Sequence, residues 1–373
     1  MTSKRTHKIE RLARLYDDEI LPVWGNRFGK MLLRGLSVPD RGQVLDVACG
    51  TGFVAAEIVR RMPAGARLIA IDGSSAMLDV ARQKLADLSA GIGKRSVFFR
   101  SEGVLPRLSF ADDVYDLVVS NLGLAEMPNP AAALRDFARV AKRGGEVRCS
   151  LPLEGSFEEF YDLYREVLIK HDKHEALDRL NQHLTGYPSG ETGAAWLEAA
   201  GLDARVEVEE FSLLFRSSRE FFFAPVIEYG PLARWKAIAG RGQELQDVFW
   251  YIKEAIDAYF AGRAFEVRIK AGCLIGRRRE TGEEAMTGRL ARVPALRDDD
   301  ATPAGGVAVD LADADAAAAV KVDSNVHTNE LDLIEIEELE PVTGDHDPVV
   351  YDDEVEIDAF VEGRPRPPHL DED

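Results

Sequence analysis

Cysteine is scarce in this sequence. Its 373 residues include three cysteines, Cys49, Cys149 and Cys273. Because they are odd in number and far apart, they do not form the framework of a small disulfide-bonded domain. Each lies in an apolar or glycine-rich setting, so we expect buried free thiols and a reducing compartment. The sequence also shows no metal-ligand cluster, no Ser/His/Asp arrangement and no solenoid-type repeat.

Long apolar runs are missing as well. No stretch of 18 consecutive apolar residues occurs, so the sequence predicts no membrane span. The first residues, Met1 to Arg5, lead into a charged segment rather than into the apolar core of a signal peptide. We therefore expect a cytoplasmic protein.

An excess of positive charge is absent too. The net charge is -19, and residues 1–280 carry 40 basic and 39 acidic side chains, whereas residues 281–373 carry 6 and 26. A neutral body offers no electrostatic footprint for nucleic acid, and an acidic tail repels phosphates. Nucleic acid is therefore excluded as an expected partner.

The most informative stretch that is present runs from Val44 to Ala55. It predicts a short apolar strand, a glycine-rich turn and the start of a helix. A second apolar strand, residues 67–71, ends on Asp72. Small residues let a backbone approach a nucleotide, and an acid about 20 residues further on can bind ribose hydroxyls. Because Gly50-x-Gly52-x-x-Ala55 also satisfies the dinucleotide fingerprint, an NAD-dependent oxidoreductase is one alternative.

Asp46 argues against a dinucleotide. This acid lies at the end of the first strand, just before the glycines. A pyrophosphate at the following helix N-terminus would be repelled by its carboxylate, whereas a ligand with an ammonium group would be attracted. S-adenosylmethionine has an ammonium, a ribose and no phosphate, so Asp46 favours this methyl donor.

Four segments, in order, resemble the motifs of class I S-adenosylmethionine-dependent methyltransferases. Residues 45–52 resemble the first motif, residues 71–78 the second, residues 105–121 the fourth-strand region, and residues 131–145 the helix and Gly-Gly turn before the fifth strand. The resemblance covers residues 40–153 specifically and 1–278 loosely. It implies an α/β fold, a Rossmann-like doubly wound seven-stranded sheet with an antiparallel last strand.

The resemblance also implies a cofactor site for S-adenosyl-L-methionine. Asp46 would meet the methionine ammonium, Asp72 the ribose hydroxyls, and Met77 would pack on adenine. Where the family carries an acid for the adenine amino group, this chain has either Ser101 or Glu102. The implied cofactor-binding residues are Asp46, Ala48, Gly50, Thr51, Gly52, Asp72, Gly73, Met77, Ser101, Glu102, Gly103, Asn121 and Leu122.

Methyl transfer is an in-line displacement that depends mainly on alignment, so a dedicated base is not always needed. Tyr16, His183 and Tyr187 lie in segments expected to cover the pocket and are the candidate bases. The segment Ser120 to Gly123 replaces the Asn-Pro-Pro-Tyr of relatives that methylate DNA bases and amides, which disfavours such acceptors.

The acceptor class is narrowed by a weaker resemblance. The Ala48 to Gly52 segment is similar to that of quinone-ring C-methyltransferases, while residues 153–160 and 215–222 resemble segments of malonyl-acyl-carrier-protein carboxyl methyltransferases. Both imply O- or C-methylation of a small, partly apolar metabolite.

The expected organisation has three parts. Residues 1–40 form a helical cap over the cofactor mouth. Residues 41–278 form the methyltransferase domain, with strands near 43–48, 67–71, 96–100, 114–120, 146–152, 206–215 and 265–275 and helical inserts near 156–190 and 216–263. The aromatic residues of the second insert predict hydrophobic packing or, alternatively, a roof over a substrate cavity.

Residues 281–373 form the third part, an acidic and largely disordered tail. Within it, the interleaved aliphatic and acidic residues 331–340 predict a segment that docks onto a protein partner. A binding or scaffold protein that uses this fold and tail is therefore a second alternative.

Overall fold

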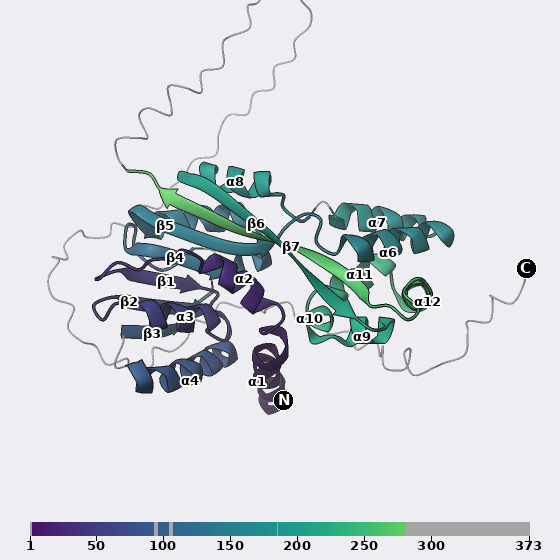
Figure 1. The fold of residues 1–373 in the computed structure, drawn as a ribbon, viewed down its shortest axis with the longest axis horizontal. Coiled ribbons are helices and arrows are strands. Elements are labelled where there is room, and N and C mark those ends of the chain that lie inside the picture. Colours follow the sequence, from purple (N-terminus) through teal and green to yellow (C-terminus); the bar gives the residue numbers. More distant parts are fainter. Residues whose placement is uncertain (1, 93–95, 104–106, 185, 281–373) are drawn as a thin grey trace, which may run out of the picture. The chain divides into compact units, whose positions relative to one another are not determined.

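The structure is a computed structural model in which residues 2–92, 96–103, 107–184 and 186–280 are described. Seven strands form one sheet of order β3-β2-β1-β4-β5-β7-β6 (Figure 1). The strands are β1 (Gln43–Val47), β2 (Arg67–Asp72), β3 (Ser96–Ser101), β4 (Tyr115–Asn121), β5 (Ala141–Pro152), β6 (Leu202–Phe215) and β7 (Phe265–Arg278).

The first five strands pair in parallel, whereas β7 pairs antiparallel with both β5 and β6. The expected doubly wound sheet with an antiparallel last strand is therefore confirmed. The strand order reverses between β1 and β4, which are neighbours in the sheet. In open α/β sheets, ligands bind outside the carboxyl ends of the strands at such a switch point.

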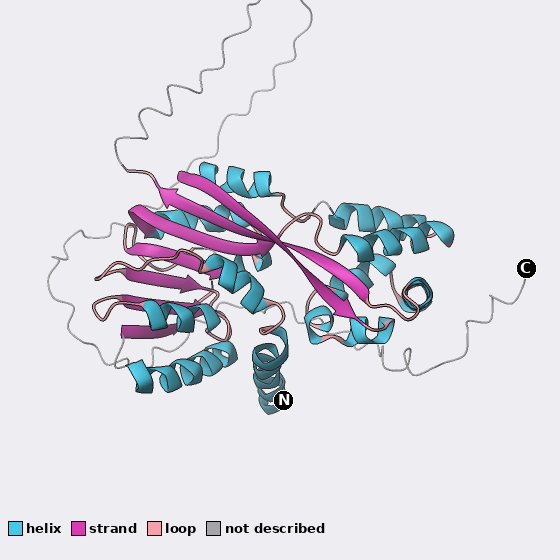
Figure 2. Cartoon of the chain, in the orientation of Figure 1, coloured by secondary structure: helices cyan, strands magenta, loops and turns pink. Residues whose placement is uncertain are grey.

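Helices cover both faces of the sheet (Figure 2). They are α1 (Thr2–Leu15), the π-helix η1 (Tyr16–Ile20), α2 (Gly25–Leu32), α3 (Phe53–Arg61), α4 (Ser75–Ile92), the 3₁₀-helix η2 (Gly123–Glu126), α5 (Pro130–Val140), α6 (Glu158–Lys170), α7 (His174–Leu184), α8 (Gly190–Ala199), α9 (Ser218–Phe223), α10 (Pro225–Glu228), α11 (Leu232–Ala239) and α12 (Gly242–Tyr259).

Two hydrophobic cores arise because successive residues of a strand point to opposite faces. Val44 of β1 belongs to a core with α2, α3 and the later helices, and Leu45 and Val47 belong to a second core with α5 and α8. The central strands therefore read as nearly continuous apolar runs, as expected when both faces of a parallel sheet are buried.

The turn at residues 142–145 differs from the expectation. It was expected to precede the fifth strand near residue 146, but β5 already begins at Ala141. Between the pairs Tyr115–Ala141 and Leu117–Glu146 the register shifts, so the turn is an irregularity within the strand. Gly144 adopts a φ of 73°, a value that glycine reaches without steric cost, and this lets the ladder resume.

The aromatic insert between β6 and β7 is a packed helical layer. Helices α9 to α12 gather around the ends of these two strands, together with α6 and α7 (Figure 1). Phe221 and Trp235 are fully buried, and their rings lie 5.7 Å apart. The interpretation as hydrophobic packing is supported, and these two side chains are core rather than cavity wall.

Arg148 is a buried cation that fastens α2 to the sheet. It lies on β5 and only 4% of its side chain is exposed. Its Nη1 donates hydrogen bonds to the carbonyl oxygens of Leu32 (3.0 Å) and Arg34 (2.6 Å), and its Nε pairs with Glu146. The guanidinium therefore satisfies carbonyls at the C-terminus of α2, where a helix leaves acceptors unpaired.

Replacing Arg148 with methionine should destabilise the fold by about 3 kcal/mol, because the buried carbonyl of Leu32 and the part-buried carbonyl of Arg34 would lose their donor. Urea unfolding followed by circular dichroism measures this free energy. Arg205→Met on β6 is the matched control, since Arg205 is 63% exposed and pairs only with Glu207 among the described residues. Equal losses in the two variants would contradict the assigned role of Arg148.

Residues 281–373, including the proposed docking segment 331–340, lie outside the described residues. Within the described ranges, no helix is both long enough and apolar enough to cross a bilayer.

Candidate functional site

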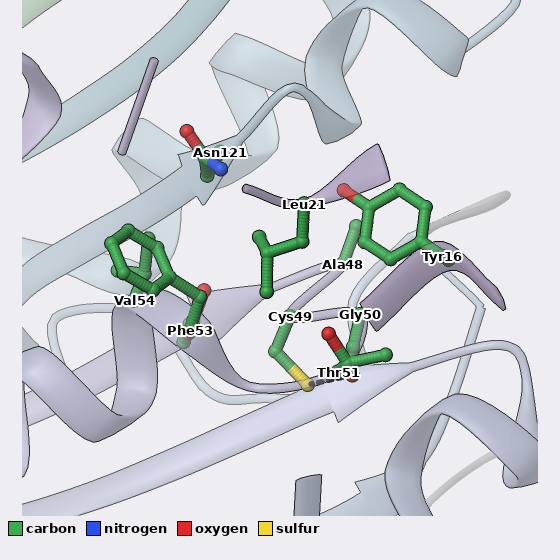
Figure 3. A pocket seen from close by; sticks show the side chains of 10 residues that line it. Tyr16, Leu21, Ala48, Cys49, Gly50, Thr51, Phe53, Val54 and Asn121 are labelled. Atoms are coloured by element: carbon green, nitrogen blue, oxygen red, sulfur yellow. Dashed lines mark hydrogen bonds between the residues drawn. The ribbon is translucent and has the colours of Figure 1, made fainter. Parts of the chain in front are cut away.

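A pocket lies at the carboxyl ends of β1 and β4, at the switch point of the sheet. It is a small recess that opens to solvent. The side chain of Leu21, from the turn after η1, lies in its middle (Figure 3). The residues that line it are Tyr16, Leu21, Asp46, Ala48, Cys49, Gly50, Thr51, Phe53, Val54 and Asn121.

Three non-glycine residues that follow β1, β4 and β5 have a left-handed backbone conformation. Ala48 follows β1 with a φ of 55°, Leu122 follows β4 with 66°, and Phe157 follows β5 with 63°. Such conformations are costly for side chains with a Cβ and persist only where the surrounding structure holds them. Ala48 and Leu122 directly follow neighbouring strands, at the edge of the sheet where the pocket lies.

Asp46 is buried in the pocket without a partner. It is 1% exposed, and neither carboxylate oxygen completes a hydrogen bond within the described structure. Burial, reinforced by the charge of Asp72, raises the pKa of Asp46 to about 8. A buried carboxyl group whose two oxygens both lack hydrogen-bond partners destabilises the folded state. It fits a site that awaits a cationic group.

Asp72 fixes the glycine-rich turn. At the end of β2, its Oδ2 accepts the N–H of Gly50 (2.8 Å) and its Oδ1 accepts the N–H of Ser74 (2.8 Å). Burial raises the pKa of Asp72, while these two donors lower it. A carboxylate offers about four lone-pair positions, so two remain available for further donors such as hydroxyl groups.

The glycines of the turn serve different purposes. A Cβ on Gly50 would meet nothing within 4 Å, so the space beside this residue is open. A Cβ on Gly52 would lie 2.8 Å from the Cβ of Ala81, so Gly52 allows α4 to pack closely. That the backbone at Gly50 and Gly52 lets the ligand pass stays a prediction.

A chain of hydrogen bonds positions the end of β4. The Oγ of Ser150 on β5 donates to Oδ1 of Asn121 (2.7 Å) and accepts the N–H of Leu122 (3.2 Å). The Nδ2 of Asn121 donates to the carbonyl of Gly25 (3.2 Å). These contacts tie the segment before β1 to the central strands and hold Leu122 in its strained conformation.

Tyr16 opens the π-helix η1 and lines the pocket. Short π-helical turns are rare and often occur at functional sites. Burial, and then the charges of Asp72, Asp17 and Glu126, raise the pKa of Tyr16 to about 12. Its hydroxyl is therefore neutral near pH 7, which suits a hydrogen-bond donor better than a base.

Several predicted site residues lie outside the lining of this pocket. Glu102 accepts hydrogen bonds from the N–H (2.8 Å) and hydroxyl (3.0 Å) of Ser109 and pairs with Arg100. The carboxylate of Glu102 thus has partners within the chain, and the choice between Ser101 and Glu102 for the adenine amino group stays a prediction. The remaining residues that do not line the pocket are Gly52, Asp72, Gly73, Met77, Gly103 and Leu122.

The other two candidate bases, His183 and Tyr187, belong to a separate cluster around the hydroxyl of Tyr161. Sequence reasoning missed that hub, and it also missed Leu21, Cys49 and Ser150. Cys49, Phe53 and Val54 lie within or beside the glycine motif. Their position at the pocket could therefore have been predicted from the sequence. Ser150 is a polar residue within an otherwise apolar stretch of β5, and this position could have indicated that its side chain takes part in the site.

The residues fit S-adenosylmethionine. Asp46 offers an unpaired carboxylate to an ammonium, and Asp72 retains acceptor positions for ribose hydroxyls. A profile of the family described as "Methyltransferase domain" matches residues 44–145. The ubiquinone/menaquinone biosynthesis C-methyltransferase UbiE of Idiomarina loihiensis is 32% identical over 206 residues, which cover 52% of this chain and 80% of that protein.

The chain belongs to the class I S-adenosylmethionine-dependent methyltransferases. It is also similar to the demethylmenaquinone methyltransferase of Clavibacter sepedonicus, with 29% identity over 52% of this chain and 79% of that protein. The demethylmenaquinone methyltransferase of Mycobacterium sp. strain KMS is 30% identical over 56% and 87%, respectively. Among solved structures, the YcgJ protein of Bacillus subtilis covers 68% of this chain and 99% of its own, with 16% identity and a TM-score of 0.44.

The enzyme uses S-adenosyl-L-methionine and transfers its methyl group to a small molecule. The alternatives, a dinucleotide-dependent oxidoreductase and a non-catalytic scaffold, gain no support from these likenesses.

Proposed function

We propose that this methyltransferase methylates a ring carbon of a hydroxylated aromatic molecule of the quinone type. Relatives that align over 79% and 80% of their length are named for demethylmenaquinone and for ubiquinone/menaquinone C-methylation. The same class of acceptor matches the expectation of a small and partly apolar metabolite.

The structural observation that carries this proposal is an aromatic cluster at the segment that contacts the pocket residue Asn121. Trp24 precedes Gly25, whose carbonyl holds Asn121, and its ring lies 6.0 Å from that of Phe157 at an interplanar angle of 29°. Phe211 packs edge-on against Trp24 at 5.9 Å. Flat apolar groups of this kind favour a flat ring, and Trp24 is only partly buried.

The proposed site divides the ligand contacts among the strand ends. When bound, S-adenosylmethionine supplies an electrophilic methyl group on a sulfonium. Asp46 attracts the ammonium, Asp72 accepts the ribose hydroxyls, and Met77, half-buried in the first turn of α4, packs on adenine. Asn121 and Leu122 border the transfer zone. Alignment of this kind can lower a barrier by roughly 7–11 kcal/mol, so the acceptor needs orientation more than it needs a strong base.

Three free thiols, Cys49, Cys149 and Cys273, support the cytoplasm as the proposed compartment, because reduced cysteines are usual there.

The test is methyl transfer from labelled S-adenosylmethionine to 1,4-dihydroxynaphthalene, with the product identified by mass spectrometry and NMR. We expect a methyl group on a ring carbon. The matched control acceptor is 1,4-dimethoxynaphthalene, which has the same rings but no hydroxyl and should not react. Transfer only to a carboxylate in a cell extract, with none to the dihydroxy ring, would contradict the proposed acceptor.

A further inference from the structure

A fully buried serine near the carboxyl end of β5 contacts a residue that lines the pocket. Ser150 is 0% exposed, and it does not line the pocket itself. Its Oγ donates to Oδ1 of Asn121 at 2.7 Å and accepts the N–H of Leu122 at 3.2 Å. Because Asn121 is one of the lining residues, Ser150 reaches the pocket through the amide of that side chain.

The hydrogen bonds of the Asn121 amide have a fixed direction. A backbone carbonyl can only accept, so the amide nitrogen is the atom that faces the carbonyl of Gly25, at 3.2 Å. The amide oxygen then faces Ser150 and accepts from its hydroxyl. The N–H of Leu122 also donates to the backbone carbonyl of Ser150 at 3.0 Å. The serine hydroxyl therefore orients the amide, whereas the N–H of Leu122 keeps a partner without it.

Gly25 transmits this contact to the N-terminal side of the pocket. It is buried at the start of α2, and a Cβ built on it would lie 2.7 Å from Cδ1 of Leu21 and 3.2 Å from the hydroxyl of Tyr16. Tyr16 and Leu21 both line the pocket, and the side chain of Leu21 lies in its middle (Figure 3). We call these two residues the N-terminal wall. Because they pack directly against Gly25, the position of its backbone sets the position of the wall.

The segment that carries the N-terminal wall has a second attachment at its other end. Asp17, next to Tyr16 in η1, forms an ion pair with Lys84 of α4, and the two side chains are 21% and 26% exposed, respectively. The segment is thus held to α4 near Tyr16 and to the end of β4 at Gly25. Losing the attachment at Gly25 should therefore loosen the wall without releasing it from the protein.

We propose that Ser150 is a positioning residue for the cofactor: by orienting the Asn121 amide towards Gly25, it holds the N-terminal wall at the S-adenosylmethionine site and slows release of the bound cofactor. This inference concerns the cofactor alone and is independent of the acceptor proposed above. A wall that is fixed before binding costs no ordering when the ligand arrives. Without the hydroxyl of Ser150, part of the binding free energy is spent on ordering the wall, and the bound ligand escapes faster.

The test measures binding and release of S-adenosylhomocysteine by the immobilised full-length protein, with surface plasmon resonance. Ser150→Ala should raise the dissociation rate constant about 10-fold, the usual effect of losing one buried hydrogen bond. The association rate constant should not fall, because a looser wall does not obstruct entry. The variant should fold, since the N–H of Leu122 still donates to the backbone carbonyl of residue 150. A change confined to the association rate constant would overturn the proposal.

Ser218→Ala is the matched control. Ser218 opens α9, is 1% exposed, and its Oγ donates to Oδ2 of Asp257 at 2.7 Å, so the substitution also removes one hydrogen bond of a buried serine. It should lower the thermal stability about as much as Ser150→Ala and leave both rate constants unchanged. If both variants lose stability alike and both release S-adenosylhomocysteine at the wild-type rate, Ser150 has only a structural role and the proposal is overturned.

A double-mutant cycle tests whether Ser150 acts through Asn121. In protein that already carries Asn121→Ala, the further change Ser150→Ala should alter the dissociation rate constant by less than about 2-fold, because the amide that it orients is gone. A 10-fold effect of Ser150→Ala that persists in this background would show that the serine acts by another route, and would overturn the proposal.

Amide hydrogen exchange of the ligand-free protein measures the same coupling without a binding step. Ser150→Ala should speed exchange in residues 16–25, because local opening of this segment becomes easier, whereas Ser218→Ala should leave exchange there unchanged. Exchange in residues 16–25 that is the same in Ser150→Ala and in the wild-type protein would overturn the assigned role of the serine.

Discussion

Replacement of Asp72 by alanine is expected to lower the affinity for S-adenosylhomocysteine by at least about 100-fold, since each hydrogen bond to a charged acceptor contributes roughly 1.5–3 kcal/mol. Two ribose hydroxyls would lose their acceptor. The turn itself would also loosen, because the N–H groups of Gly50 and Ser74 both donate to this carboxylate. Calorimetry at a fixed pH measures the dissociation constant.

Asp79→Ala is the control for this variant. Asp79 lies on the same helix that follows β2, is 68% exposed and pairs with Arg82 at 2.7 Å. Its removal changes the net charge by the same amount without touching the turn, so affinity should change by less than about 2-fold. Equal losses for Asp72→Ala and Asp79→Ala would mean that general electrostatics, and not ribose binding, sets the affinity.

Asp46→Asn should stabilise the cofactor-free protein and at the same time weaken cofactor binding. The unfolded carboxyl titrates near 3.8, whereas burial raises the folded pKa to about 8. Between these values the folded state holds a proton that the unfolded state has released, so stability falls as the pH rises and the loss is complete above about pH 8. The cost reaches roughly 4 kcal/mol at pH 7.

Asparagine removes this titration. At pH 8 the melting temperature of Asp46→Asn should therefore exceed that of the wild-type protein by about 10 °C, and the difference should shrink as the pH is lowered towards 4. Scanning calorimetry at a series of pH values measures it. A variant that melts below the wild-type protein at pH 8 would show that Asp46 does not carry the assigned electrostatic cost.

The same substitution should lower the affinity for S-adenosylmethionine by at least about 100-fold, the usual effect of removing one partner of a buried ion pair. An ammonium selects the ionised form of Asp46, so binding to the wild-type protein at pH 6.5 should release about one proton. Calorimetry in buffers of different ionisation enthalpy counts that proton. Asp46→Asn should release none, which separates charge pairing from a loss of shape.

The strands and the glycine turn were predictable because their signals are local. The apolar runs of β1 and β2, the acids at their ends and the spacing of Gly50 and Gly52 all lie within 30 residues. The doubly wound seven-stranded sheet with an antiparallel last strand followed from the family resemblance and is confirmed. Asp46 and Asp72 were predicted as site residues because they lie at the carboxyl ends of parallel strands. Such ends all meet at one edge of the sheet.

Other features could not be derived because they depend on contacts between distant segments. Arg148 binds carbonyls more than 110 residues earlier, and Ser150 binds Asn121 29 residues away. Tyr161 joins Trp235, 74 residues further along the chain. No periodicity or motif in the sequence predicts such hydrogen-bonded pairs. The irregular start of β5 was missed because a Gly-Gly turn commonly precedes a strand, whereas here the ladder begins before it.

The aromatic insert between β6 and β7 shows what can be predicted about a segment from its amino-acid composition alone. Its rings predicted packing, and Phe221 and Trp235 are indeed fully buried. Composition could not show that one indole N–H of this core would donate to a tyrosine shared with His183 and Tyr187. That arrangement converts two weak candidate bases into parts of one hydrogen-bonded cluster.

A crystal structure of the protein with S-adenosylhomocysteine tests the account most directly. The account predicts the amino group of the ligand beside the carboxylate of Asp46, directly or through one water, and both ribose hydroxyls on Asp72. An adenosyl ligand bound at another edge of the sheet, or at this edge with either carboxylate turned away from it, would contradict the account.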